Sequence, residues 1–178
     1  MFRCLLVLLT CSLLLGFASC PKITVGFTPG ENCNNLIIDS VDHAKESVLV
    51  QAYSINSESI AKSLIRAKER GVDVKVILDE SAINGIHSVI NQLFEHTIPI
   101  WIDFKPAIAD NKVVIIDNQK IITGSNFSHN AQRRNAENLL IITGDSSLIE
   151  RYIQNWKDRQ SQSEFYNKAP RRITRIWD

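Results

Sequence analysis

The stretch from Asp110 to Ser125 contains residues whose types and spacing suit phosphate chemistry. Lys112 and Asp117 are separated by the apolar run VVII, and Gly124-Ser125 follows Asp117 after six residues. A lysine at the mouth of a sheet, beside a Gly-Ser turn with its hydroxyl and backbone N–H groups, is suited to holding a phosphate. An exposed lysine at a strand end and an ordinary turn serine would give the same pattern, so spacing alone does not separate the two interpretations.

The apolar run predicts a strand that separates Lys112 from Asp117. Side chains alternate between the two faces of a strand, so Lys112 shares one face with Val114 and Ile116, while Asp117 belongs to the other face. We therefore do not expect Lys112 and Asp117 to form a simple salt bridge.

The elements that must position these residues alternate between strands and amphipathic helices, which predicts an α/β domain. A turn between residues 117 and 120 predicts a hairpin. The expected strands are 22–27, 48–55, 72–78, 98–103, 111–117, 120–125 and 137–143, and the expected helices are 34–47, 56–71, 85–96 and 146–160.

The first twenty residues are expected to be a signal peptide. Arg3 precedes an apolar run, and small residues lead to Cys20, which is the layout of a secretory signal. The run is shorter than the ~20 residues of a comfortable membrane span, so a retained anchor is the lesser alternative. Cleavage with release and lipidation of Cys20 both stay open. We expect residues 21–160 to form one domain and 161–178 a C-terminal tail, in a periplasmic, secreted or membrane-anchored protein.

The charge balance excludes one mode of partner binding. The chain has 20 Lys and Arg against 19 Asp and Glu, and only Arg3 lies in the first twenty residues. Proteins that bind long stretches of duplex nucleic acid by neutralising phosphates alone have a larger excess of Lys and Arg than this chain has. Binding to a polyanion would have to use local patches, for which 132–134 and 170–175 are the candidates.

Taken together, the motifs resemble the small, single-motif branch of the phospholipase D superfamily, the secreted or periplasmic Nuc-type endonucleases. The resemblance runs from about Gly26 to Arg159. The family signature is His-x-Lys, four residues, Asp, six residues and Gly-Ser, with an Asn just beyond and a Glu on the next strand. The matching residues here are Lys112, Asp117, Gly124, Ser125 and Glu137.

The resemblance implies a central mixed sheet flanked by helices on both faces, with one motif per chain. It implies that a histidine forms a covalent phosphohistidine and that its counterpart in a second motif protonates the leaving oxygen. Asp110, Lys112 and Asp117 would stand at the catalytic positions of the motif. Lys112, Ser125 and Asn126 would hold the phosphate, and Glu137 would support the site. It also implies no metal and no cofactor, and a homodimer whose active site lies across the two-fold axis.

Two departures from the family pattern bear on activity. Asp110 occupies the position of the family histidine, and a carboxylate is a weaker nucleophile that repels an anionic substrate and is a poor acid unless its pKa is raised. The turn is one residue shorter than the usual Gly-Ser-x-Asn-Phe, which puts the placement of Asn126 in question. His129, four residues beyond Ser125, is a conceivable substitute acid or base, although such a histidine is more often an exposed loop residue.

Three functions follow from the pattern. The first is an exported, metal-independent endonuclease that hydrolyses DNA or RNA without strong sequence preference. The second is a phospholipase D that acts on phospholipid head groups. The third is a catalytically impaired member that binds nucleic acid or anionic lipid, which both departures favour.

Overall fold

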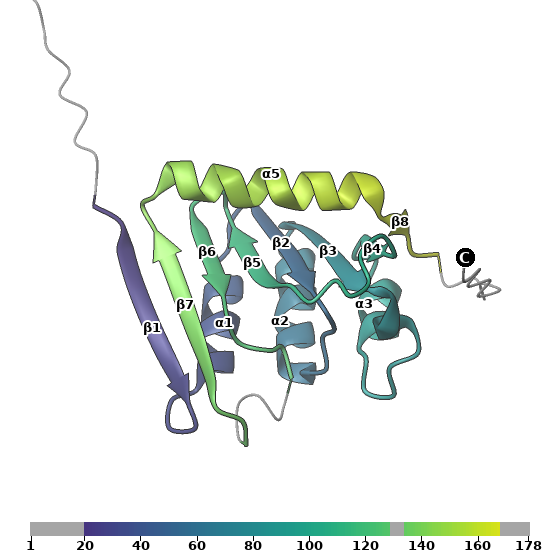
Figure 1. The fold of residues 1–178 in the computed structure, drawn as a ribbon, viewed down its shortest axis with the longest axis horizontal. Coiled ribbons are helices and arrows are strands. Elements are labelled where there is room, and N and C mark those ends of the chain that lie inside the picture. The colour runs from purple at the N-terminus through teal and green to yellow at the C-terminus, as the bar shows by residue number, and fades with distance from the viewer. Residues whose placement is uncertain (1–19, 129–133, 168–178) are drawn as a thin grey trace, which may run out of the picture.

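The computed structural model describes residues 20–128 and 134–167, and the expected signal segment lies outside them, apart from Cys20. An eight-stranded mixed sheet runs through the molecule in the order β1-β7-β6-β5-β2-β3-β4-β8 (Figure 1). The strands are β1 (Lys22–Thr28), β2 (Ser47–Ala52), β3 (Asp73–Asp79), β4 (Ile100–Asp103), β5 (Lys112–Ile116), β6 (Lys120–Thr123), β7 (Glu137–Thr143) and β8 (Glu164–Phe165).

Strand direction divides the sheet into two parts. Strands β2, β3 and β4 are parallel neighbours, and every other pairing is antiparallel. Lys112 pairs with Ala52, the last residue of β2. The carboxyl ends of the three parallel strands therefore lie where β5 begins and β6 ends, and we call this the Lys112 end of the sheet. Open α/β sheets commonly bind ligands beyond the carboxyl ends of their parallel strands.

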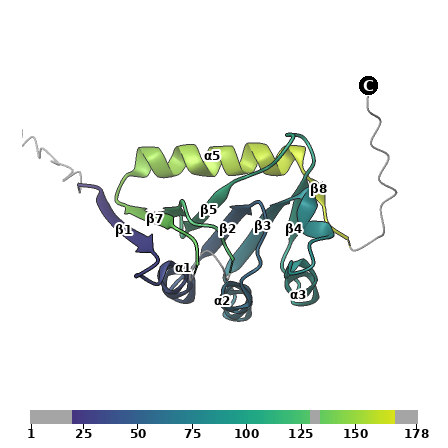
Figure 2. The ribbon, with the colours of Figure 1, turned by 60° about the horizontal axis from the view of Figure 1, so that its bottom comes forward.

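Helices cover both faces, as Figure 2 shows. α1 (Cys33–Asp42), α2 (Glu58–Glu69) and α3 (Ile90–Glu95) lie on one face, while α5 (Ser146–Gln162) crosses the other; a short 3-10 helix, η1 (Glu80–Ile83), follows β3. The side chains of Asn32, Ser57 and Asp145 cap α1, α2 and α5 by accepting first-turn N–H groups, which satisfies donors that have no partner inside the helix.

Each face of the sheet has its own apolar core. Val114 and Ile116 of β5 pack towards α1, α2 and α3, whereas Val113 and Ile115 pack under Ile149, Ile153 and Trp156 of α5. This alternation is the one that a strand period of two predicts. The structure confirms the expected α/β class and the mixed sheet with helices on both faces.

Several segments differ in length from the sequence expectation. The helix expected over 34–47 ends at Asp42, because the N–H groups of residues 45–47 donate to the carboxylate of Asp117 instead of continuing the helix. The strand expected over 48–55 ends at Ala52. The helix expected over 85–96 begins only at Ile90, because the preceding residue, Val89, donates its N–H to the carbonyl oxygen of Ile55 instead of entering a helical turn. At the other end of the chain, α5 continues to Gln162, and β8 then pairs with β4. The tail therefore contributes an edge strand before residue 168, where the described part ends.

Candidate functional site

Most of the candidate residues meet at the Lys112 end of the sheet. Lys112 is the first residue of β5, Gly124 directly follows β6, and Glu137 opens β7. Because β5, β6 and β7 are antiparallel neighbours, the start of β5, the end of β6 and the start of β7 coincide in space. The hairpin turn that the sequence predicts is what brings Lys112 and Ser125 together.

The ammonium group of Lys112 is already paired in this structure. Its Nζ atom lies 2.5 Å from Oδ1 of Asp110 and 3.3 Å from the carbonyl oxygen of the same residue. The side chain of Asp110 is 62% exposed and that of Lys112 is 21% exposed. Exposed ion pairs contribute only about 0–1 kcal/mol, so a phosphate can displace this carboxylate from Lys112. Asp110 thus competes for the phosphate position without closing it.

The backbone on both sides of Asp110 is held firmly. The N–H of Ala109 donates to Oδ2 of buried Asp79 at 2.7 Å. On the other side, the carbonyl oxygen of Asn111 accepts the N–H of Tyr53 at 3.0 Å, and Oδ1 of Asn111 accepts a hydrogen bond from buried Gln51 at 2.9 Å. The backbone at position 110 is therefore held as rigidly as the position of a nucleophile requires. The residue at this position is an aspartate.

The Gly-Ser turn depends on a backbone conformation that favours glycine. Gly124 has φ +113°, and a Cβ atom added there would lie 2.5 Å from the carbonyl oxygen of Asn138. Ser125 follows with its side chain fully buried. Its Oγ donates a hydrogen bond to the carbonyl oxygen of Asn126 at 3.5 Å, a length at which the bond is weak.

Glu137 holds Asn126 in place. The backbone N–H of Asn126 donates to Oε2 of Glu137 at 3.1 Å, and its Nδ2 donates to both carboxylate oxygens at 3.1 Å. Asn135 adds a hydrogen bond at 3.0 Å, while Thr28 accepts the N–H of Glu137 at 3.1 Å. In the short turn, Asn126 is therefore hydrogen-bonded to Glu137 and lies next to Ser125.

The charge on Glu137 is stabilised at this position. Burial acts to raise the pKa of its carboxyl group, but hydrogen bonds from Asn135 and Asn126 and the positive charge of Lys112 outweigh burial, so the pKa lies below its usual value. Glu137 is consequently ionised at neutral pH. It can orient Asn126 and balance the charge of Lys112, and it is a poor proton donor.

The structure does not bring Asp117 to this cluster. Asp117 follows the last residue of β5, and a five-residue strand separates it from Lys112 by roughly 15 Å. Its carboxylate accepts the backbone N–H groups of Lys45, Glu46 and Ser47 at 2.8–3.1 Å. Asp117 therefore fastens the loop after α1 to the hairpin turn.

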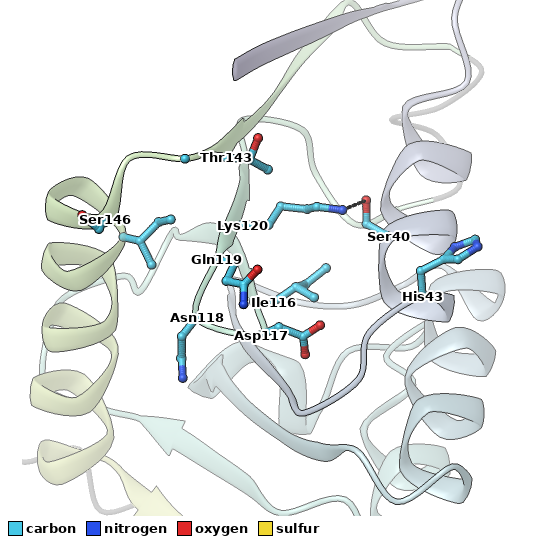
Figure 3. A pocket seen from close by; sticks show the side chains of 11 residues that line it. Ser40, His43, Ile116, Asp117, Asn118, Gln119, Lys120, Thr143 and Ser146 are labelled. Carbon is cyan, nitrogen blue, oxygen red and sulfur yellow. Dashed lines mark hydrogen bonds between the residues drawn. The ribbon is translucent and has the colours of Figure 1, made fainter. Parts of the chain in front are cut away.

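Figure 3 shows the hollow of about 600 Å³ that Asp117 lines together with Ser40, His43 and Lys120. Burial would raise the pKa of Asp117, but the three backbone N–H donors and the charge of Lys120 hold the pKa below its usual value. The contacts observed for Asp117 are structural, and its catalytic role stays a prediction.

Several residues of the site were missed by the sequence analysis. Asp79, Gln51 and Thr28 fix the cluster through contacts that are distant in sequence and that no local motif marks. Asn135 acts locally, two residues before Glu137. His129 lies outside the described residues. Within the ranges 20–128 and 134–167, no three His, Cys, Asp or Glu side chains gather as a metal site requires, and no helix has the length and apolar character to span a membrane.

Comparison with known proteins gives consistent similarities. A family model described as "Cardiolipin synthase, PLD-like domain" matches residues 37–159. A phospholipase D of Rickettsia bellii is 42% identical over 143 residues, which cover 80% of this chain and 71% of that protein.

Two solved structures are also similar. Nuc, a phospholipase D family member from Salmonella typhimurium, has a TM-score of 0.78 and 34% identity, covering 83% of this chain and 99% of that one. NucT from Helicobacter pylori has a TM-score of 0.76 and 26% identity, covering 82% of this chain and 99% of that one.

Proposed function

Since the chain belongs to the phospholipase D superfamily, in its single-motif branch, we propose that it binds nucleic acid phosphodiesters at the Lys112 end of the sheet and hydrolyses them slowly. The observation that carries the proposal is the convergence of Lys112, Ser125 and Asn126 on one fixed cluster. A cation and a hydroxyl can hold the non-bridging oxygens of a phosphodiester, while Glu137 accepts both hydrogen bonds from the amide of Asn126 and keeps that amide beside them.

Asp110 accounts for the slow hydrolysis. Its carboxylate oxygen can attack phosphorus and form an acyl phosphate, as carboxylates do in some ATPases. The bond from phosphorus to the leaving oxygen then breaks, and water hydrolyses the intermediate and regenerates the carboxylate. The leaving oxygen must take its proton from water, because Asp110 is bonded to phosphorus as the nucleophile and ionised Glu137 holds no proton. This missing general acid is worth typically 10²–10⁴-fold in rate.

The test compares the protein with Asp110→His and Asp110→Asn variants on plasmid DNA and RNA, with and without a chelator. We expect slow, chelator-resistant cleavage by the unaltered protein, a gain of at least about 100-fold for Asp110→His, and no cleavage by Asp110→Asn. Turnover by the unaltered protein equal to that of Asp110→His would contradict the proposed role of Asp110. Failure of all three proteins to bind DNA would contradict the proposed substrate.

Phospholipid head groups are the second candidate substrate. The observation in their favour is the 42% identity to a Rickettsia protein named phospholipase D. Release of the head group from phosphatidylcholine, measured in the same series of variants, distinguishes the two substrates. Hydrolysis of lipid without cleavage of nucleic acid would favour this second function.

A homodimer is part of the proposal. α5 packs over β2, β3, β4, β5 and β6, and it leaves β1 and β7 uncovered on that face (Figure 2). Ile23, Val25 and Phe27 are exposed there, each between 46% and 62%, and Leu140 and Ile142 of β7 lie beside them. An apolar sheet face of this kind commonly marks a protein interface. A second copy that covers it would account for the exposure and allow two motifs to form one active site.

Export is also part of the proposal, and it rests on the sequence of residues 1–20 alone. Cleavage of this segment would place the domain in the periplasm or outside the cell, with Cys20 either removed or lipidated. Mass spectrometry of the protein recovered from the producing cells would identify the mature N-terminus, and retention of Met1 would contradict export by cleavage.

A further inference from the structure

A second recess lies at the Lys112 end of the sheet, beside the group formed by Lys112, Ser125, Asn126 and Glu137, which we call the phosphate cluster. It has a volume of about 560 Å³ and lies between the start of α2 and the start of α3. The residues that line it are mostly polar, and those that matter here are Asn56, Glu58, His87, Ser88, Gln92 and Ser128. The phosphate cluster described above uses none of them.

Backbone hydrogen bonds fix the walls of the recess to the Gly-Ser turn. The N–H groups of Asn56 and Ser57 both donate to the carbonyl oxygen of buried Phe127, at 2.9 and 3.0 Å. Val89 donates its N–H to Ile55 at 3.1 Å, which brings the start of α3 against the same loop. The recess is thus built on the residues that immediately follow Asn126.

The recess lies within reach of a group attached to the bound phosphate. Tyr53 is hydrogen-bonded to Asn111, the neighbour of Lys112. Asn56 lies three positions after Tyr53, so the chain between them spans at most about 11 Å. A nucleoside joined to a phosphate at Lys112 extends over a comparable distance.

The side chains suit an uncharged ring that forms hydrogen bonds. The amides of Asn56 and Gln92 offer a donor and an acceptor each, which is the pattern that pairs with base edges. The imidazole of His87 is exposed and can stack on a base.

The same side chains do not suit a quaternary ammonium group. Such a group is recognised by an aromatic cage, and no Phe, Tyr or Trp is among the described residues that line the recess. Glu58, the carboxylate among the described residues that line the recess, already has a cationic partner in Lys62 at 2.8 Å. The recess therefore favours a nucleobase over a choline head group.

We infer that this recess is a nucleobase-binding subsite, in which His87 stacks on the base next to the bound phosphodiester while Asn56 and Gln92 contact its edge. The inference rests on the proposed function, because it needs a phosphodiester at Lys112. It assigns the substrate class to nucleic acid through residues outside the motif.

The test measures binding of a short labelled single-stranded oligonucleotide and of an abasic oligomer with the same backbone. We expect the unaltered protein to bind the base-bearing probe about tenfold more tightly, since stacking contributes roughly 1–3 kcal/mol per base. His87→Ala and Gln92→Ala should remove most of this preference and leave abasic binding unchanged. His43→Ala, an exposed histidine at the opposite end of the sheet, is the matched control and should retain the preference.

The possible outcomes separate the inference from the proposed function. If the two probes bind equally and Lys112→Met abolishes that binding, the inference is overturned and the proposed phosphate site stands. Binding of neither probe would overturn both. Loss of binding to phosphatidylcholine vesicles in His87→Ala, without any preference for bases, would identify the recess as a lipid head-group site and overturn the nucleobase assignment.

Discussion

At the scale of single residues, Gly124 is the motif residue whose identity the backbone determines most strictly. Replacement by alanine adds a Cβ that lies 2.5 Å from a backbone oxygen, at φ +113°, so either the turn or β7 must move. We expect Gly124→Ala to lower the free energy of unfolding by about 3 kcal/mol and to weaken phosphate binding by displacing Ser125. Urea denaturation measures the first effect.

Gly71→Ala is the matched control for that substitution. Gly71 also has a positive φ, +89°, but a Cβ atom there meets no other atom within 4 Å. Only backbone strain of about 1 kcal/mol is expected, with no change in phosphate binding. Equal destabilisation by the two substitutions would show that the contact with Asn138 has no part in the effect.

Asp117 provides a prediction about pH. The pKa of its carboxyl group is lowered in the folded protein, since three backbone N–H donors and Lys120 outweigh the opposing effect of burial. A carboxyl group with a depressed pKa stabilises the fold above its unfolded pKa of about 3.9 and loses that contribution as the pH falls through the folded value. Glu137 acts in the same direction.

We therefore expect Asp117→Asn to cost about 1–2 kcal/mol at neutral pH and to flatten the loss of stability below about pH 4. Urea denaturation over a pH series measures both effects. Asp39→Asn on the exposed face of α1 is the control. It should change neither the stability at neutral pH nor the loss of stability in acid. An unchanged acid dependence in Asp117→Asn would mean that the three N–H contacts do not stabilise the folded state.

At the scale of elements, two buried aspartates hold the loop that carries Asp110. Asp79 and Asp103 end the parallel strands β3 and β4 and are paired in register. Asp79 accepts the N–H of Ala109, while Asp103 accepts the N–H of Lys105 and three hydrogen bonds from Arg159 of α5 at 2.5–2.8 Å. The helix thus neutralises a charge that would otherwise be buried alone.

Arg159→Met should consequently destabilise the protein by about 3 kcal/mol, because it leaves the carboxylate of Asp103 buried without its partner. Adding Asp103→Asn should restore a substantial part of this loss, since the amide carries no charge. Thermal or urea unfolding of the two single variants and the double variant measures the coupling. Additive effects in the double variant would contradict a shared role of the pair.

These elements also show how far the sequence could predict the site. The hairpin and the grouping of Lys112 with Ser125 follow from strand periodicity within one continuous segment, whereas the mixed sheet and the place of Glu137 are implied by the family resemblance. The partners of Asp117 and Ala109 lie some 70 and 30 positions away in sequence. Such contacts depend on the order of strands in the sheet, and no local pattern encodes them.

At the scale of the whole molecule, Cys20 and the phosphate cluster lie at opposite ends of the sheet. The start of β1 pairs with the end of β7, and Glu137 pairs with Thr28 at the other end of the same ladder. Cys20 therefore precedes the sheet at the end opposite the phosphate cluster, roughly 20 Å away along the seven residues of β1. An anchor at Cys20 would direct the cluster away from its membrane, which favours a polymer in solution over the lipids of that membrane.

The uncovered face of β1 and β7 leads to the last prediction. Val25 lies between Ile23 and Phe27 on this face and is 46% exposed. Val25→Asp should therefore leave the fold intact but place a charge in the centre of the proposed dimer interface, where an unpaired charge is costly. We expect a change from dimer to monomer in sedimentation and, since each dimer combines two motifs, a parallel loss of phosphodiester cleavage in the activated Asp110→His background.

Ile86→Asp is the control for this substitution, because Ile86 is 95% exposed in the loop before α3 and lies away from β1. It should leave the mass of the assembly unchanged. A monomeric unaltered protein, or a Val25→Asp variant that stays dimeric, would contradict the proposed interface. Full activity in a monomeric variant would show that one motif suffices, and the phosphate cluster would then be a complete site within a single chain.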